Sequence, residues 1–269
     1  DIPIDTCVKS AILDDKGENI SLTFSPESKK ISFSTSWLET YAYDVNKIFL
    51  KGWISPDLKV WKSDMSKNIP NIDYKTAKSN NTLLFKWMKS LYEYGFAKIT
   101  GGNKESGAII QIANLIGYIR ETNYGKFFDV KSEINPVNLA YTNLGLQAHT
   151  DNPYRDPVPT IQILYCLENS ASGGDSKVVD GFKAAILLKE KNQEYFDLLS
   201  KYCARFEYNG DAKTYLQARR PMIELSPDGQ IIAIRFNNRS AAPITDVPYN
   251  DMENYYNAYR KFSEIIDDP

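Results

Sequence analysis

The sequence predicts a mainly β protein with flanking helices, built as a small N-terminal β subdomain followed by a larger sandwich or barrel. Short stretches of alternating apolar and polar residues outnumber helical stretches, and turn-forming residues separate them. The chain has 269 residues, 42% of them hydrophobic, which suffices for one large domain and a small one. We place the boundary near residue 75, so that 1–75 is the subdomain with its linker and 76–269 the main domain.

The N-terminal region has the pattern of a small sheet. Residues 20–24 and 31–34 alternate apolar and polar side chains, and the turn-forming run S-P-E-S at 25–28 separates them. Residues 46–80 show little periodicity and contain Pro, Lys and Asn clusters. We therefore expect two strands followed by a linker across the surface.

Two amphipathic helices are predicted next. Apolar residues recur at three- and four-residue steps over 84–91, and Gly95 stands where a helix C-cap belongs. A second stripe over 109–116 ends at Gly117, and residues 96–100 form a strand between the two helices. We interpret both apolar stripes as core packing.

The rest of the chain is rich in predicted strands. They cover residues 136–142, 160–167, 177–180, 204–208, 222–225 and 231–237, with S-P-D-G as a hairpin turn between the last two. Predicted helices cover 182–189, 193–200 and 251–266, the last with Asn250 or Asp251 as N-cap.

Composition excludes several classes of function. The net charge of -2 comes from 32 basic and 34 acidic residues that are interleaved, so we expect no nucleic-acid or membrane partner and favour a small molecule. No apolar run approaches the roughly 18 residues that span a bilayer. Three distant cysteines, Cys7, Cys166 and Cys203, exclude a disulfide framework and indicate a reducing compartment, which we take to be the cytoplasm.

The single histidine of the chain is the best functional clue. It lies in the run Q-A-H-T-D, in which His149 and Asp151 are two residues apart. In an extended segment both side chains point to one face while Thr150 turns away. Facial-triad Fe(II) sites begin with such an H-x-D pair. On spacing alone, however, a hydrogen-bonded surface pair is the more common arrangement.

Other catalytic classes have less support. The sequence contains no G-x-G-x-x-G and no G-x-x-x-x-G-K-[ST], so nucleotide-binding loops of these types are excluded. A serine triad would need a G-x-S-x-G elbow, which is absent, and a base two residues from its own carboxylate has the wrong geometry. Paired-carboxylate glycosidase chemistry stays open, because no spacing among the 34 acidic residues selects a pair.

Further motifs surround the H-T-D run. Residues 138–142 read N-L-A-Y-T, residues 161–167 read I-Q-I-L-Y-C-L, and residues 173–182 read G-G-D-S-K-V-V-D-G-F. Together with H-T-D at 149–151, they resemble the γ-butyrobetaine hydroxylase branch of the taurine dioxygenase-like family. The resemblance extends from about residue 20 to the last residue. This combination is far more specific than H-x-D alone.

The resemblance implies a double-stranded β-helix (jelly roll) that binds Fe(II) and 2-oxoglutarate and hydroxylates a trimethylammonium substrate with O2, giving succinate and CO2. His149 and Asp151 match the first two iron ligands, and Ser176 matches a hydroxyl that binds 2-oxoglutarate. From the residues alone, Ser176 is a turn residue after Gly-Gly.

The resemblance also assigns substrate contacts. A quaternary ammonium has no hydrogen to donate and is recognised by ring faces; Tyr124, Phe128 and Tyr141 fall on the cage positions, although single aromatic residues in a chain with 18 Tyr and 12 Phe are more often core or surface. Asn138 and Asn237 match amides that hold the distal anion. The implied substrate is γ-butyrobetaine or 2-(trimethylamino)ethylphosphonate.

The chain departs from the family pattern in two regions. The family's distal histidine and its 2-oxoglutarate-binding arginine have no match before Pro269, so we expect a C-terminally incomplete catalytic domain. A zinc site in the N-terminal subdomain is not supported, because Cys7 is the only matching ligand there. A non-catalytic quaternary-ammonium binding protein and an unrelated jelly-roll binding module remain as alternatives. Relatives suggest a homodimer.

Overall fold

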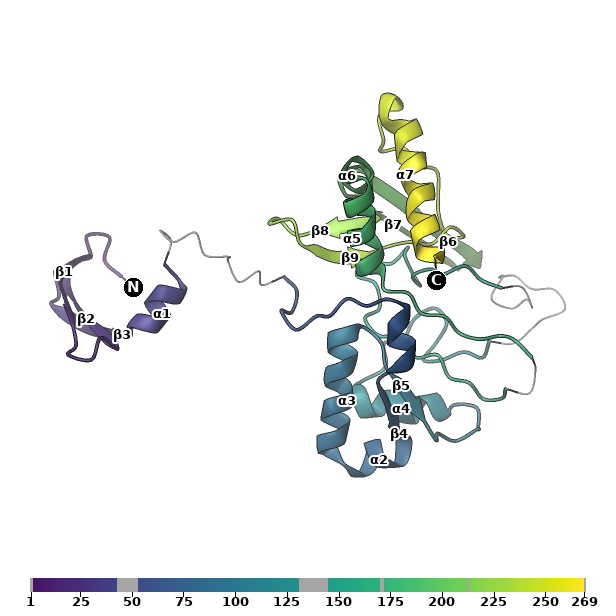
Figure 1. The fold of residues 1–269 in the computed structure, drawn as a ribbon, viewed down its shortest axis with the longest axis horizontal. Coiled ribbons are helices and arrows are strands. Elements are labelled where there is room, and N and C mark those ends of the chain that lie inside the picture. The colour runs from purple at the N-terminus through teal and green to yellow at the C-terminus, as the bar shows by residue number, and fades with distance from the viewer. Residues whose placement is uncertain (1, 43–52, 131–144, 170–171, 212, 269) are drawn as a thin grey trace. The chain divides into compact units, whose positions relative to one another are not determined.

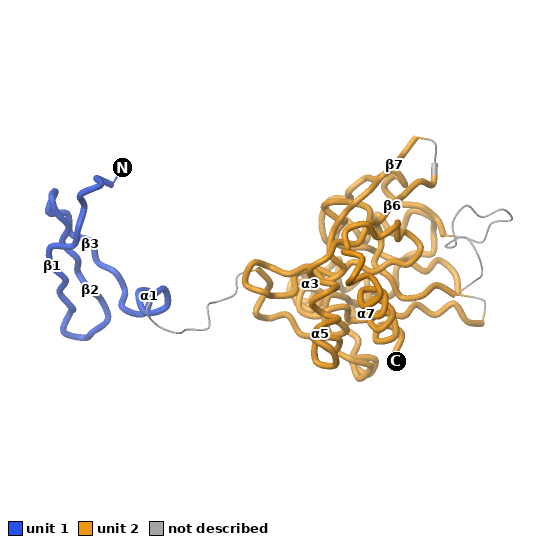
Figure 2. The backbone as a smooth tube through the Cα atoms, turned by 90° about the horizontal axis from the view of Figure 1, so that it is seen from above, with its two compact units in different colours: residues 1–50 blue, residues 51–269 orange. Residues whose placement is uncertain are grey.

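A computed structural model describes residues 2–42, 53–130, 145–169, 172–211 and 213–268 (Figure 1). The chain forms two compact units, residues 1–50 and residues 51–269 (Figure 2).

The first unit is a small antiparallel sheet followed by a short helix. Its strands are β1 (Cys7–Leu13), β2 (Asn19–Ser25) and β3 (Lys29–Ser34), in the order β1-β2-β3, and the helix is α1 (Thr35–Thr40). In the register of β2 on β3, Leu22 pairs with Ile31 and Ile20 with Phe33. The two predicted strands are confirmed, and β1 is a third strand that the alternation did not indicate.

The second unit begins with a small α/β layer. Strands β4 (Asn71–Asp73) and β5 (Lys98–Thr100) are parallel, and they are surrounded by a 3-10 turn (Ser63–Lys67) and three helices, α2 (Tyr74–Ser79), α3 (Asn81–Tyr94) and α4 (Ala108–Ile116). The segment predicted as a linker thus contains β4 and α2, because Ile72 and Ala77 are buried with Trp87 in a local core.

Helix α3 contains the predicted apolar stripe and ends at Gly95 as predicted. The Asn80 side chain accepts a hydrogen bond from Leu83 N at 3.0 Å, and Gly95 ends the helix with a φ of 77°. That left-handed conformation favours glycine over residues with a Cβ. Helix α4 likewise ends at Gly117 as predicted.

The main core lies between three helices and two antiparallel hairpins. Helices α5 (Gly181–Lys191), α6 (Gln193–Lys201) and α7 (Tyr249–Asp267) pack on one another beside the hairpins β6 (Cys203–Asp211)–β7 (Thr214–Pro221) and β8 (Ile223–Leu225)–β9 (Ile231–Ile234) (Figure 1). The largest buried side chains of this core are aromatic: Phe206, Phe236, Tyr255 and Phe262. All three helices are confirmed, but α7 begins after Pro248, two residues earlier than predicted.

Two predicted strands are wrong. Residues 160–167 and 177–180 have no strand conformation, and side chains in them are exposed, as for Leu164 at 68% and Val178 at 55%. An alternating pattern forms a strand only when a neighbouring strand pairs with its backbone, and no such pairing is present in the described ranges. The predicted strand at 136–142 lies outside the described residues.

Asp180, near the end of the run G-G-D-S-K-V-V-D-G-F, is the N-cap of α5. One carboxylate oxygen accepts hydrogen bonds from Phe182 N and Lys183 N at 2.9 and 3.0 Å, and the other accepts from Trp61 N at 2.8 Å. Asp180 therefore anchors α5 and the segment that enters the second unit.

We expect Asp180→Ala to lower the free energy of unfolding by about 1–2 kcal/mol, because the cap is lost and the Trp61 N–H loses its partner. Asp180→Asn keeps an acceptor oxygen and should lose less. Urea unfolding curves of both variants test this prediction; an unchanged midpoint for Asp180→Ala would contradict it.

Candidate metal centre and its surroundings

His149 and Asp151 bring an imidazole and a carboxylate together at the edge of the main core. His149 Nε2 lies 3.1 Å from Asp151 Oδ1, and the imidazole is 19% exposed. This distance confirms that the two side chains converge as predicted, although residues 147–151 form no strand.

Thr150, between them, is tied to the segment that follows β9. Thr150 N donates to Phe236 O at 2.7 Å, and Phe236 N donates to Thr150 Oγ1 at 3.0 Å. Asn237 Nδ2 donates to Thr150 O at 3.0 Å. Because Thr150 is held against the core on one side, His149 and Asp151 project from the other.

The orientation of the imidazole is set by a backbone carbonyl. His149 Nδ1 lies 2.6 Å from Gln147 O. A carbonyl oxygen can only accept, so the proton of the neutral ring is on Nδ1 and the lone pair is on Nε2. A metal-binding histidine is commonly oriented in this way, with its second nitrogen donating to a backbone carbonyl.

Helix α7 holds Gln147 in place through its side chain. Gln147 Nε2 donates to Ser263 Oγ at 2.9 Å and to Asp267 Oδ2 at 2.5 Å. Asn238 Nδ2 donates to Gln147 Oε1 at 2.6 Å, and the Tyr259 hydroxyl donates to Asn238 Oδ1. The last two turns of α7 thus support the residue that orients the imidazole, a connection that sequence spacing did not indicate.

Arg239 lies directly in front of the imidazole. One of its terminal nitrogens is 2.7 Å from His149 Nε2. The two residues line a cavity of about 190 Å³ together with Gly145, Leu146, Gln147, Ala148 and Asn238. The cavity therefore has the nitrogen lone pair of His149 and a guanidinium in its wall.

His149 and Asp151 shift each other's pKa toward the charged form. The neighbouring Asp151 carboxylate raises the pKa of His149, while partial burial acts in the opposite direction. In turn, the protonated ring, whose Nε2–H donates to Asp151, lowers the pKa of Asp151, and a hydrogen bond from Gln162 also contributes. Only neutral imidazole binds a metal. Because the pKa of His149 is raised, protons compete with a metal for Nε2 up to a higher pH.

The pair fits two adjacent ligands of a divalent metal. Nitrogen and oxygen ligands at about 2.1 Å from a metal, at right angles, are about 3.0 Å apart, and Nε2 and Oδ1 are separated by 3.1 Å. Imidazole with carboxylate is a donor set that suits iron. Across the described residues, His, Cys, Asp and Glu side chains form no metal-binding group of three or more.

An aromatic cluster includes Tyr154, whose hydroxyl is within electrostatic reach of Asp151. The rings of Tyr124 and Phe128 are 5.2 Å apart, Tyr208 meets Tyr124 edge-on at 5.7 Å, and Tyr154 lies 5.2 Å from Tyr208. The hydroxyls of Tyr124 and Tyr154 are hydrogen-bonded at 3.0 Å. The structure thus brings together the predicted Tyr124 and Phe128. Sequence reasoning missed Tyr154 and Tyr208, although Tyr154 is three residues after Asp151.

The other predicted site residues have different surroundings. Ser176 is exposed in the irregular segment before α5. Asn138 and Tyr141 lie outside the described residues. Asn237 is buried, at 4% exposure, and its Oδ1 accepts from the backbone nitrogens of Arg239 and Ser240 at 3.0 and 3.1 Å.

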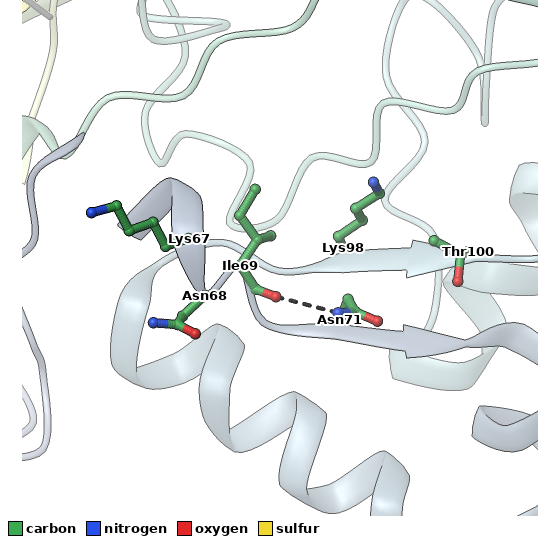
Figure 3. A pocket seen from close by; sticks show the side chains of 6 residues that line it. All are labelled: Lys67, Asn68, Ile69, Asn71, Lys98 and Thr100. Carbon is green, nitrogen blue, oxygen red and sulfur yellow. Dashed lines mark hydrogen bonds between the residues drawn. The ribbon is translucent and has the colours of Figure 1, made fainter. Parts of the chain in front are cut away.

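A second and larger hollow lies elsewhere in the second unit. Figure 3 shows this hollow of about 510 Å³ beside β4 and β5, lined by Lys67, Asn68, Ile69, Asn71, Lys98 and Thr100. The two lysine side chains point in different directions, and all six residues are exposed. The hollow shares no residue with the His149 cavity, and its lining offers no metal ligand pair.

None of the helices in the described ranges combines the length and apolar character that a membrane crossing requires.

Comparison with known proteins identifies relatives. A family model described as "Taurine catabolism dioxygenase TauD, TfdA family" matches residues 57–269. The chain is 30% identical to a gamma-butyrobetaine dioxygenase of Pseudomonas sp. (strain AK-1) over 269 residues, 100% of this chain and 69% of the relative. It is 28% identical to the human gamma-butyrobetaine dioxygenase over 96% of this chain and 67% of that protein. A trimethyllysine dioxygenase of Meyerozyma guilliermondii is 26% identical over 96% and 68%, respectively.

Proposed function

Because the chain belongs to the taurine catabolism dioxygenase TauD, TfdA family, a family of Fe(II)- and 2-oxoglutarate-dependent dioxygenases, we propose that it hydroxylates a small trimethylammonium substrate with a distal anion. The observation that carries the proposal is the His149–Asp151 pair, whose Nε2 and Oδ1 have the separation of two adjacent metal ligands. The family fold implies that the β-rich part of the second unit belongs to a double-stranded β-helix.

In this proposal the chain's own residues position the reaction. His149 and Asp151 would hold the iron, and the Gln147 carbonyl, by accepting from Nδ1, would leave the Nε2 lone pair of His149 available to it. Iron with 2-oxoglutarate and O2 supplies the oxidising chemistry when bound, so that one oxygen atom enters the substrate C–H bond and the other enters succinate as CO2 leaves. Ser176 donates its hydroxyl to 2-oxoglutarate.

The aromatic cluster is the proposed binding site for the trimethylammonium group. Tyr124 and Phe128 supply ring faces, with Tyr141 as the third wall, and each ring contributes on the order of 0.5–2 kcal/mol. The Tyr124 hydroxyl is held by Tyr154, which fixes the ring before the substrate arrives. Asn138 and Asn237 hold the distal anion; Asn237 Nδ2 has two N–H groups, one of which donates to Thr150 O.

Tyr124 provides a direct test of the cage. We expect Tyr124→Leu to raise the Kd of the trimethylammonium substrate by about 2- to 30-fold, because a ring face is lost. Tyr124→Phe keeps the ring and removes only the hydroxyl, so its Kd should change less. Calorimetric titration with γ-butyrobetaine measures both, and equal effects of the two variants would show that the ring face does not bind the cation.

Substrate competition distinguishes the remaining candidates. γ-Butyrobetaine, its phosphonate analogue and trimethyllysine, the substrate in a relative's name, are supplied together with Fe(II), 2-oxoglutarate and O2, and the hydroxylated products are identified by mass spectrometry. The proposal expects one of the first two to be consumed first. Binding of these compounds without any turnover would favour the alternative, a non-catalytic quaternary-ammonium binding protein.

A further inference from the structure

Arg239 forms the closest contact to the metal-binding nitrogen of His149. Its terminal nitrogen is 2.7 Å from Nε2, while Nδ1 is occupied by the Gln147 carbonyl. In the neutral ring, whose proton is on Nδ1, the lone pair of Nε2 accepts an N–H of Arg239. A metal needs that same lone pair, so Arg239 and a metal cation compete for His149.

The backbone of Arg239 is held by a hydrogen bond, whereas its side chain is exposed. Asn237 Oδ1 accepts from Arg239 N at 3.0 Å, and Asn237 is itself buried and bonded to Thr150 O. The Arg239 side chain is exposed and lines the cavity in front of His149. The guanidinium can thus leave Nε2 and still remain at the cavity wall.

The positive charge of Arg239 is not neutralised by an ion pair in the described part of the chain. Within the described part of the chain, its guanidinium forms no ion pair with an acidic side chain, unlike Arg205, Arg219 and Arg220. A divalent cation held by His149 and Asp151 would add positive charge close to the Arg239 guanidinium, which contacts the same imidazole nitrogen. A guanidinium displaced from Nε2 in this setting has its planar fork of N–H donors available for a carboxylate or phosphonate.

We propose that Arg239 is an anion receptor coupled to the metal: it donates to His149 Nε2 until a metal takes that nitrogen, and then binds the anionic group of the molecule in the cavity. This inference rests on the proposed metal site at His149 and Asp151. The anionic group is a carboxylate of 2-oxoglutarate or the distal carboxylate or phosphonate of the substrate, and the two sources share one chemistry.

Replacing Arg239 should change the affinity for the metal and the affinity for the anion in opposite directions. In Arg239→Met, a metal alone should bind more tightly, because its competitor and a repelling charge are removed. The anion should bind the metal-loaded protein about tenfold more weakly or worse, because a charge-assisted hydrogen bond is lost. A purely structural role for Arg239 would weaken both, and linkage requires that metal and anion assist each other less in the variant.

The experiment is calorimetric titration of the protein with Mn(II), followed by 2-oxoglutarate alone or γ-butyrobetaine alone added to the metal-loaded protein. Wild type, Arg239→Met, Arg239→Lys and His149→Ala are compared. Arg260→Met serves as the matched control, because Arg260 lies on α7, is not among the residues that line the His149 cavity, and donates a hydrogen bond to Asn257 at 3.4 Å. Butyltrimethylammonium, which has no anion, is the ligand control.

Tighter Mn(II) binding with weaker binding of either anion in Arg239→Met supports the proposal, and the affected anion identifies the source. Arg239→Lys should restore part of the anion affinity. The proposal is overturned if Arg239→Met weakens Mn(II) binding, or if both anions bind as in wild type. Failure of the metal site itself is recognised separately, since wild type would then bind Mn(II) no better than His149→Ala.

Discussion

Replacing His149 by alanine should abolish turnover and most metal affinity. The variant removes the nitrogen that faces Asp151 at 3.1 Å, and the chain has no second histidine to replace it. Removal of an outer-shell partner typically costs roughly 10–100-fold in metal affinity or activity, and the loss of a ligand itself should exceed that range. Succinate release with Fe(II), 2-oxoglutarate and substrate measures the effect.

Gln147→Ala is the matched control for this prediction. It keeps the backbone carbonyl that accepts from His149 Nδ1 and removes only the side chain that α7 holds. We expect the turnover of Gln147→Ala to be lower than that of wild type by roughly 10–100-fold at most. Turnover of His149→Ala equal to that of Gln147→Ala would show that His149 has no ligand role.

The second large effect is expected at Phe262, in the core beneath the site. Phe262 is fully buried, and its ring meets Phe236 edge-on at 5.6 Å. Phe262→Ala should lower the free energy of unfolding by about 3–5 kcal/mol. The variant loses the free energy gained by burying the ring, and the cavity that remains adds a further cost. Since Phe236 holds Thr150, the variant should also loosen His149 and Asp151.

Tyr249→Ala, on the same helix, serves as the control. Tyr249 is 93% exposed at the start of α7, so its replacement should change stability by no more than about 0.5 kcal/mol. Chemical unfolding of both variants gives the comparison. If Phe262→Ala unfolded at the same denaturant concentration as Tyr249→Ala, that result would contradict the packing of Phe262 in this core.

The parts of the fold with local signals could be predicted from the sequence. Helix α3 has its apolar stripe and Gly95 at its end, and the N-terminal strands have alternation with a turn between them. The irregular segments at 160–167 and 177–180 show the limit of that approach. Alternation describes which side chains share a face, but pairing depends on a second strand elsewhere in the chain.

The candidate site divides in the same way. His149 and Asp151 are two residues apart, so their convergence follows from the period of an extended chain. Gln147 and its partners on α7 are separated by 116 and 120 positions, and Arg239 is 90 positions from His149. No local pattern encodes such contacts, because they arise only when the core brings α7 and the segment after β9 together. The homodimer and the compartment stay predictions.

We propose that His149 and Asp151 form an iron site that couples 2-oxoglutarate to hydroxylation of a trimethylammonium compound. The most direct measurement is succinate release by the protein with Fe(II), 2-oxoglutarate and O2, with and without γ-butyrobetaine or its phosphonate analogue. We expect succinate release to depend on one of these substrates, to equal the amount of hydroxylated product, and to disappear in both His149→Ala and Asp151→Ala. Substrate-dependent release that persists in either variant would contradict it.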